Sequence, residues 1–205
     1  MTAPAIDAVI VDSGGANLAS LQFALQRIGA TSSVTADPQA IRRAPRVVLP
    51  GVGSAADAMA RLVRSGLDRM LPQLTQPVLG ICLGMQLLYE RSAEGATACL
   101  GIVPGTVQRL EPVQGRPVPH MGWNRVRRRA PHALLDGIDD ATHFYFVHSY
   151  AAPVAGESIA VTDYGADFTA IVVQGNFLGT QFHPERSGPA GAHILANFLR
   201  LSPCS

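Results

Sequence analysis

Residues 77–86, Pro-Val-Leu-Gly-Ile-Cys-Leu-Gly-Met-Gln, decide the fold of this chain. The run 77–81 is apolar and rich in branched side chains, as in a strand that is buried on both faces. At Cys82 the pattern changes, and we expect a helix over residues 83–92. A buried strand that leads at once into a helix is the repeating unit of a parallel α/β sheet.

The same alternation of strand and helix fills the first half of the sequence. Strands are expected over residues 5–11 and 46–50, and helices over 18–28 and 54–65. Asn17 is a candidate cap for the first of these helices. Because the strands are almost continuous apolar runs, we predict an α/β fold with a mostly parallel central sheet flanked by helices on both faces.

The second half of the sequence has a different character. Between residues 101 and 179 the helical pattern fades, and short strands separated by Gly and Pro turns follow. The expected strands are 106–110, 124–128, 143–150, 158–164, 169–174 and 176–182. We expect them to form antiparallel additions to the parallel sheet or a smaller second sheet, with a closing helix over 189–201. No repeat or long linker divides the sequence, so residues 1–205 are expected to form a single domain.

Composition excludes several classes of function. Of the 205 residues, 47% are hydrophobic and 15% are charged, which is typical of a globular protein. The net charge of +1 gives no electrostatic reason to expect nucleic acid or a membrane surface as a partner. No apolar stretch approaches the roughly 20 residues of a membrane helix, and the N-terminus lacks the basic start of a signal peptide. We therefore expect a cytoplasmic protein.

The three cysteines are an odd number without a Cys-x-x-Cys pair, so neither a disulfide framework nor a metal site is indicated. Cys82 is different from Cys99 and Cys204 because Gly80 and Gly84 surround it at the junction of strand and helix. This is the form of a nucleophile elbow, in which larger side chains at the glycine positions would collide with the backbone. The N-terminus of the following helix favours a thiolate and an oxyanion. A buried structural cysteine is the alternative, and Cys82 alone does not decide between them.

A cysteine nucleophile needs a base, and the base needs a group that orients it. His183 is followed by Pro184, which favours an extended conformation at the histidine. In an extended segment Glu185 would lie on the same side as His183 and fix its tautomer. The conjunction of this triplet with an elbow cysteine predicts a Cys82–His183–Glu185 catalytic triad.

The turn Gly51-Val52-Gly53 follows the strand 46–50 and should lie at the same sheet edge as Cys82. A backbone N–H of this turn could complete an oxyanion hole with the N–H of Leu83. In isolation, a plain tight turn is the simpler interpretation of these glycines.

Three motifs in this order, PGVG at 50–53, GICLGMQ at 80–86 and HPE at 183–185, resemble those of the class I (triad) glutamine amidotransferases. PHMGWN at 119–124 and YFVHSY at 145–150 are similar to the glutaminase subunits of imidazole glycerol phosphate synthases. The resemblance covers almost the whole chain and implies a flavodoxin-like fold. Only the last two stretches separate this subfamily from other amidotransferases.

The resemblance implies that glutamine is hydrolysed through a γ-glutamyl thioester on Cys82, with His183 cycling as base and acid. Gln86 and Glu94 match positions that contact the amino-acid head of the substrate. The backbone around Ser149 and Tyr150 matches another segment that contacts it. No cofactor is implied.

The resemblance also implies a partner, a (βα)8-barrel cyclase subunit that receives the ammonia within a heterodimer in histidine biosynthesis. Tyr145, His148 and Arg186 match the face that gates this transfer. The segment 119–124 should border the same interface through His120, Met121, Trp123 and Asn124. The sequence departs from the family pattern at Ser13 and Ala16 in the first loop. It also has Arg186 in place of the usual lysine, in a chain whose sixteen basic residues are all arginine.

Other interpretations remain open at this point. Trp123, Tyr145 and Tyr150 could be ordinary core aromatics. The arginines at 125, 127, 128 and 129 could be a solvated strand face or could dock on an acidic rim of a partner. The whole chain could be a stand-alone thiol hydrolase or a non-catalytic module, or it could serve another acceptor, such as those of pyridoxal phosphate or anthranilate synthesis. The intact triad argues against a non-catalytic module, and the stretches 119–124 and 145–150 argue against a stand-alone hydrolase.

Overall fold

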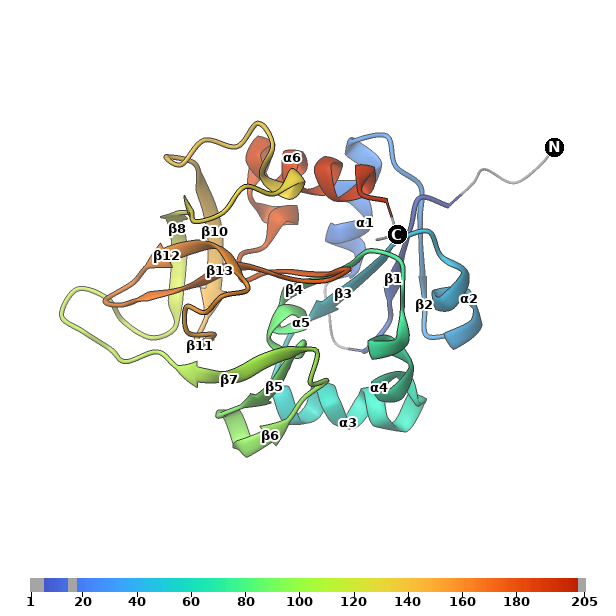
Figure 1. Cartoon of the computed structure of the whole chain (residues 1–205), viewed down its shortest axis with the longest axis horizontal. Coiled ribbons are helices and arrows are strands. Elements are labelled where there is room, and N and C mark those ends of the chain that lie inside the picture. Colours follow the sequence, from blue (N-terminus) through green and yellow to red (C-terminus); the bar gives the residue numbers. More distant parts are fainter. Residues whose placement is uncertain (1–5, 15–17, 203–205) are drawn as a thin grey trace.

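The computed structural model describes residues 6–14 and 18–202, and an eight-stranded sheet lies at its centre in the order β2-β1-β3-β4-β14-β13-β12-β9 (Figure 1). Five strands are parallel: β2 (Ser32–Thr35), β1 (Ala8–Val11), β3 (Val47–Gly51), β4 (Val78–Cys82) and β14 (Phe177–Thr180). Three continue it in antiparallel pairing: β13 (Asp167–Gln174), β12 (Ser158–Asp163) and β9 (Arg127–Arg128). The predicted mostly parallel sheet with antiparallel additions is confirmed.

Helices cover both faces of the parallel strands. On one face lie α1 (Leu18–Arg27) and α6 (Gly188–Arg200), and on the other α2 (Pro38–Arg43), α3 (Ala55–Ser65) and α4 (Leu67–Met70) (Figure 1). Strand β1 shows why both faces need covering, because successive side chains of a strand point to opposite faces of the sheet. Ala8 and Ile10 join the core under α1 and α6, whereas Val9 and Val11 join the core under α3. In the described part of the chain, no helix is long and apolar enough to cross a membrane.

The second half also builds two smaller sheets. A four-stranded sheet has the order β11 (Tyr150–Ala151), β7 (Val103–Arg109), β5 (Tyr89–Ser92) and β6 (Thr97–Ala98). A two-stranded sheet pairs β8 (His120–Arg125) with β10 (His143–His148). Both of the arrangements expected for the second half, additions to the main sheet and a separate sheet, therefore occur together.

The helix predicted over residues 83–92 is wrong. Helix α5 (Leu83–Gln86) has a single turn, and the chain then enters strand β5. Leu87, Leu88 and Tyr89 are all buried, so three consecutive residues pack against protein instead of one face of a helix. Strand β5 bonds β6 on one side and β7 on the other. This pairing with distant residues overrides the local helical preference.

Three further expectations need correction or lie outside the described residues. The strand expected at 176–182 belongs to the parallel part of the sheet, because β14 runs parallel to β4. The strand expected at 124–128 is divided between β8 and β9, with the buried Val126 between them. The proposed cap Asn17 lies outside the described residues, whereas Ser54 caps α3 by accepting the N–H of Asp57.

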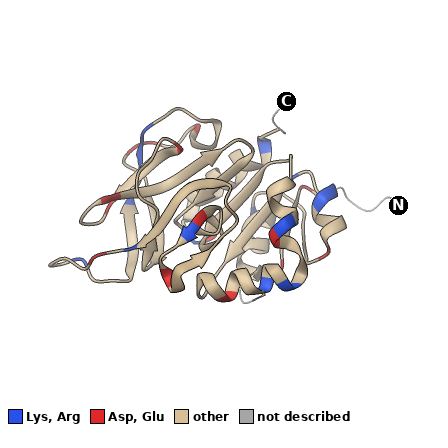
Figure 2. Ribbon diagram, turned by 60° about the horizontal axis from the view of Figure 1, so that its bottom comes forward, with Lys and Arg blue, Asp and Glu red and all other residues tan. Residues whose placement is uncertain are grey.

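Charged side chains do not define one face of the molecule. Figure 2 shows basic and acidic positions dispersed over helices, strands and loops. With a net charge of +1, the chain therefore shows no strongly charged face in this view.

Candidate active site

Cys82 ends strand β4 with φ 53° and ψ −111°, a conformation that L residues rarely adopt. Its neighbours hold it there. A Cβ on Gly80 would lie 2.7 Å from the carbonyl oxygen of Gly84, and a Cβ on Gly84 would overlap the carbonyl oxygen of Leu49. The steric reason predicted for the two glycines is therefore confirmed, and Cys82 occupies a strained elbow at the start of α5.

His183 and Glu185 are in contact, as the sequence predicts, but the backbone conformation that brings them together is not the predicted one. The Nδ1 atom of His183 lies 2.7 Å from Oε1 of Glu185, and both side chains are 11% exposed. His183 is extended, but Pro184–Arg186 forms a turn of 3-10 helix, so the extended segment expected through Glu185 is wrong. The main-chain N–H of His183 donates to the carbonyl of Tyr145 at 2.9 Å, which ties the histidine to strand β10.

The surroundings of His183 favour its protonated form. Burial acts most strongly and lowers the pKa, but hydrogen bonding to Cys82 and Glu185 and their negative charges together outweigh it, so the pKa of His183 is raised. Oε1 of Glu185 holds Nδ1–H, which directs Nε2 to the other side of the ring. The result is an imidazolium hydrogen-bonded to Cys82 and Glu185, as a base that serves a cysteine nucleophile requires.

A cavity of about 410 Å³ opens at Cys82 and brings together every residue predicted for catalysis and substrate binding. Its walls include Gly51, Val52, Gly53, Cys82, Leu83, Gln86, Glu94, Ser149, Tyr150, His183 and Glu185. Two of these side chains are held in place by the backbone. Gln86 donates to the carbonyl of Tyr150 at 2.7 Å, and Glu94 accepts the N–H of Ala55 at 2.7 Å.

Sequence reasoning missed two neighbours of the nucleophile. The sulfur of Cys82 lies 3.7 Å from the carbonyl oxygen of Val147 and 3.8 Å from Nε2 of Gln181. A signal for Gln181 was present, because it precedes His183 by two residues in an extended segment. Residues two apart in an extended segment point to the same side, so Gln181 could be expected on the side of His183.

The glutamine amidotransferase class-I family model matches residues 9–201. The chain belongs to the class I glutamine amidotransferases. Imidazole glycerol phosphate synthase subunit HisH of Xanthomonas campestris pv. campestris is 51% identical over 196 residues, which cover 96% of this chain and 98% of the relative. The subunit of the same name from Xylella fastidiosa is 50% identical over 195 residues, covering 95% and 98%.

A solved structure supports the fold of this amidotransferase. The crystal structure of a glutamine amidotransferase superposes with a TM-score of 0.71 at 18% sequence identity, covering 93% of this chain and 98% of the other. The arrangement of strands and helices is thus retained where the sequences have diverged.

The residues expected at a partner interface occupy strands β8 and β10, except for Arg186, which lies in the 3-10 turn Pro184–Arg186. Trp123 pairs with Tyr145 across the two strands, and their rings meet edge to face at 6.1 Å. The guanidinium of Arg186 lies 4.8 Å from the centre of the Tyr145 ring. Trp123 is 56% exposed and Met121 is 68% exposed, so Trp123 is not a core aromatic of this amidotransferase.

Beneath this exposed face lies a buried pair of histidines. Nδ1 of His120 is 3.0 Å from Nε2 of His148, and Nδ1 of His148 is 2.9 Å from the carbonyl of Tyr150. Because that carbonyl can only accept, His148 carries its proton on Nδ1 and His120 must donate to it. Burial lowers the pKa of His148 to about 3 and that of His120 to about 4, so both are neutral.

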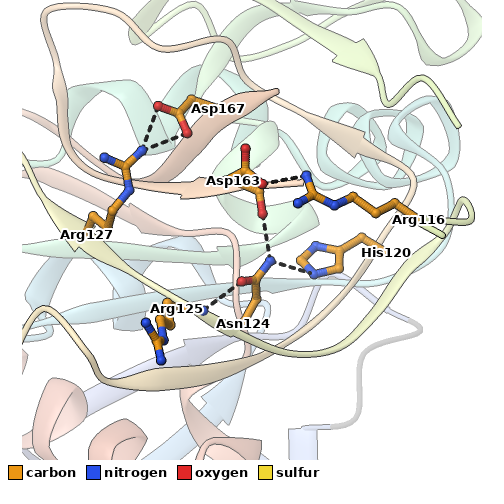
Figure 3. Close-up of polar contacts among 7 residues, drawn as sticks. All are labelled: Arg116, His120, Asn124, Arg125, Arg127, Asp163 and Asp167. Atoms are coloured by element: carbon orange, nitrogen blue, oxygen red, sulfur yellow. Dashed lines mark hydrogen bonds and ion pairs between the residues drawn. The ribbon is translucent and has the colours of Figure 1, made fainter. Parts of the chain in front are cut away.

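Figure 3 continues this chain of contacts toward the surface, where Asn124 lies 3.4 Å from Nε2 of His120 and donates to the carbonyl of Asp163 at 2.9 Å. These residues line a second cavity of about 460 Å³ together with Met121 and Trp123. The predicted gate residues are therefore divided. His148 and Arg186 line the first cavity, whereas His120, Met121, Trp123 and Asn124 line the second.

Most side chains of the arginine cluster at 125–129 bind other groups of the same chain. Arg127 binds both carboxylate oxygens of Asp167 at 2.7 and 2.8 Å (Figure 3). Arg128 donates to the carbonyls of Leu135 and Ile138, and Arg129 donates to those of Ala155 and Ser158. Three of the four arginines therefore hold neighbouring strands and loops together.

The first loop departs from the family pattern at a buried position. Ser13 is 7% exposed, and its carbonyl accepts Nε of Arg61 at 2.6 Å. Its hydroxyl lies 3.5 Å from the carbonyl oxygen of Pro50 at the end of β3, while Ala16 lies outside the described residues.

Proposed function

We propose that this amidotransferase is the glutaminase subunit of an imidazole glycerol phosphate synthase. It hydrolyses glutamine at Cys82 and passes the ammonia to a (βα)8-barrel cyclase subunit in a cytoplasmic heterodimer for histidine biosynthesis. The whole chain, residues 1–205, serves as one amidotransferase domain. One observation carries the proposal: the triad faces a cavity that also contains Gln86 and Glu94. The name shared by the two relatives supports the choice of synthase.

The chemistry follows from the positions of the groups. The Cys82 thiolate attacks the γ-amide carbon of glutamine, and backbone N–H groups of Leu83 and of the turn 51–53 stabilise the oxyanion that forms. His183 donates its proton to the departing nitrogen, so ammonia leaves and a thioester remains. His183, now neutral, removes a proton from water, which attacks the thioester and releases glutamate. Glu185 holds the ring through both steps.

Recognition of glutamine assigns complementary roles to two side chains. The Glu94 carboxylate attracts the α-ammonium group of the substrate, and the Gln86 amide binds its polar head. Because backbone groups of Ala55 and Tyr150 already hold these side chains, little rotational freedom is lost when the substrate binds.

The test measures glutamate release from glutamine by the chain alone and then with a cyclase subunit and its ribonucleotide substrate. We expect weak activity alone and a large increase in the complex. Equal, high activity under both conditions would contradict a partner-gated glutaminase and would favour a stand-alone hydrolase.

Cys82→Ala separates the two half-reactions. Without the sulfur no thioester forms, so glutamine-dependent turnover of the complex should be lost. Turnover supplied with free ammonium should persist, because the cyclase chemistry does not need the cysteine. Residual glutaminase activity in this variant would remove Cys82 from its role as nucleophile.

A further inference from the structure

Gln181 lies directly after strand β14, behind the nucleophile, and its side chain is fully buried. A primary amide loses its water partners at such a place and is costly unless protein groups replace them. Both ends of this amide have partners. Nε2 lies 3.8 Å from the sulfur of Cys82, and Oε1 accepts Nε2 of Gln86 at 3.0 Å.

The orientation of the Gln181 amide is fixed by its neighbours. Nε2 of Gln86 donates to the carbonyl of Tyr150, which can only accept, so the nitrogen end of Gln86 must face this way. The same nitrogen donates its second hydrogen to Gln181, which must therefore present its oxygen to Gln86. A reversed Gln181 would set two N–H donors against each other. The N–H of Gln181 is consequently directed at the sulfur.

The sulfur of Cys82 lies between a donor and an acceptor. As a thiol it can donate to the carbonyl of Val147 at 3.7 Å. As a thiolate it is repelled by that carbonyl and accepts the N–H of Gln181, in a hydrogen bond strengthened by the charge. The two neighbours therefore distinguish the protonation states of the nucleophile, and Gln181 favours the reactive one.

We propose that Gln181 is a positioning residue, whose N–H holds the Cys82 sulfur as a thiolate and whose carbonyl oxygen fixes Gln86 at the wall of the cavity. The single buried amide of Gln181 thus contacts both the nucleophile and Gln86, which lines the cavity. The part that concerns Gln86 rests on the proposed glutaminase function, whereas the part that concerns Cys82 needs only a reactive sulfur.

The experiment follows alkylation of Cys82 by iodoacetamide across a range of pH, with peptide mass spectrometry to separate Cys82 from the other cysteines. Neither glutamine nor a partner is present. In Gln181→Met the midpoint of the rate profile should move up by about one pH unit, the shift that matches loss of one charge-assisted hydrogen bond. In the complex with the cyclase, kcat of this variant should fall because less of Cys82 is present as thiolate. KM for glutamine should rise because the Gln86 side chain has lost its hydrogen bond to Gln181.

Gln76→Met is the matched control. Gln76 is also a buried glutamine, 8% exposed, whose Nε2 donates to the carbonyl of Ile41 at 2.9 Å, away from the cavity. We expect it to lose stability in a similar way and to keep the alkylation midpoint of the unmodified chain. Equal midpoints in the unmodified chain and Gln181→Met would overturn the proposal, and so would equal shifts in both variants.

If Gln181→Met does not fold, Gln86→Met takes its place, because loss of Gln86 lets the Gln181 amide turn away from the sulfur. An upward shift then supports the proposal, and an unchanged midpoint overturns it. Because alkylation requires no glutaminase activity, a chain that failed the test of the proposed function would still give a result here.

Discussion

Glu185 holds His183 with one carboxylate oxygen, while its other oxygen, Oε2, is buried and has no hydrogen-bond partner among the described residues. Glu185→Gln should lower kcat for glutamate release by up to roughly 10⁴-fold, the loss seen when the orienting acid of a serine-protease triad becomes an amide. The neutral amide no longer stabilises the imidazolium, and its NH₂ group can select the wrong tautomer. Steady-state glutaminase assays of the complex measure the effect.

Thermal unfolding of Glu185→Gln provides the control for that experiment. We expect only a modest change, because the substitution keeps the size of the side chain. Unchanged kcat in a folded variant would show that His183 needs no orienting charge.

Gly84 tests the packing of the elbow without touching the reacting groups. A Cβ at this position would overlap the carbonyl of Leu49 in the neighbouring strand β3, and backbone cannot move as a flexible side chain does. Gly84→Ala should therefore lower the free energy of unfolding by more than about 3 kcal/mol or prevent folding. Urea unfolding measures the change.

Gly156→Ala is the matched control for Gly84→Ala. Nothing lies within 4 Å of a Cβ added at Gly156, and its φ lies outside the left-handed region. Its free energy of unfolding should change by less than about 0.5 kcal/mol. Similar stabilities for the two alanine variants would contradict the close packing of the elbow.

At the scale of elements, strands β8 and β10 enclose the neutral pair of His120 and His148, and this makes stability depend on pH. An unfolded histidine has a pKa of about 6.5. The folded pKa of His148 is about 3, so below pH 6.5 the unfolded chain binds a proton that the folded chain excludes. The stability contributed by the neutral histidine is complete above pH 6.5 and declines as the pH falls toward the folded value.

His148→Gln should therefore reduce the slope of unfolding free energy against pH by about 1.4 kcal/mol per pH unit between about pH 5 and 6. Urea unfolding at several pH values measures the slope. His143→Gln is the control, because His143 is exposed on the same strand. Equal slopes for the unmodified chain and His148→Gln would show that His148 is not kept neutral.

Local pattern predicted the elements that carry their own signal. Strands β1, β3 and β4 are buried on both faces and read as apolar runs, and α3 has its Ser54 cap and an apolar face. Strand β5 had no such signal, because the ends of Tyr89–Ser92 are buried and its two central residues are exposed, which is not the alternation of a strand. It depends on pairing with β7. Strand β2, with the sequence Ser-Ser-Val-Thr and every residue half-buried, was not predicted for the same reason.

At the scale of the whole molecule, the site was predictable because of the topology. The carboxyl ends of β3, β4 and β14 lie side by side in the sheet, so the segments that follow them meet at one edge. That rule places the turn 51–53, Cys82 and His183 together without knowledge of the side-chain contacts. It does not orient individual amides, and for this reason the contact between Gln181 and the sulfur required the structure.

The exposed aromatic face predicts where the proposed cyclase subunit docks. Large aromatic side chains at the centre of an interface commonly contribute most of the binding free energy. Trp123→Ala should therefore weaken association with the cyclase by roughly tenfold or more. Calorimetric titration measures the Kd. Phe23→Ala is the control, because Phe23 is 60% exposed on α1, and an equal loss of affinity there would contradict the assignment of the face.

Trp123 is also the only tryptophan of the chain. Its indole lies in water at 56% exposure and touches Tyr145, the residue whose carbonyl binds the main chain of His183. The molecule thus has its single tryptophan at the surface where a partner would cover it, and its neighbour Tyr145 is hydrogen-bonded to the backbone of His183. The emission spectrum of Trp123 depends on its exposure to water, so assembly with a partner can be followed by intrinsic fluorescence without an added label.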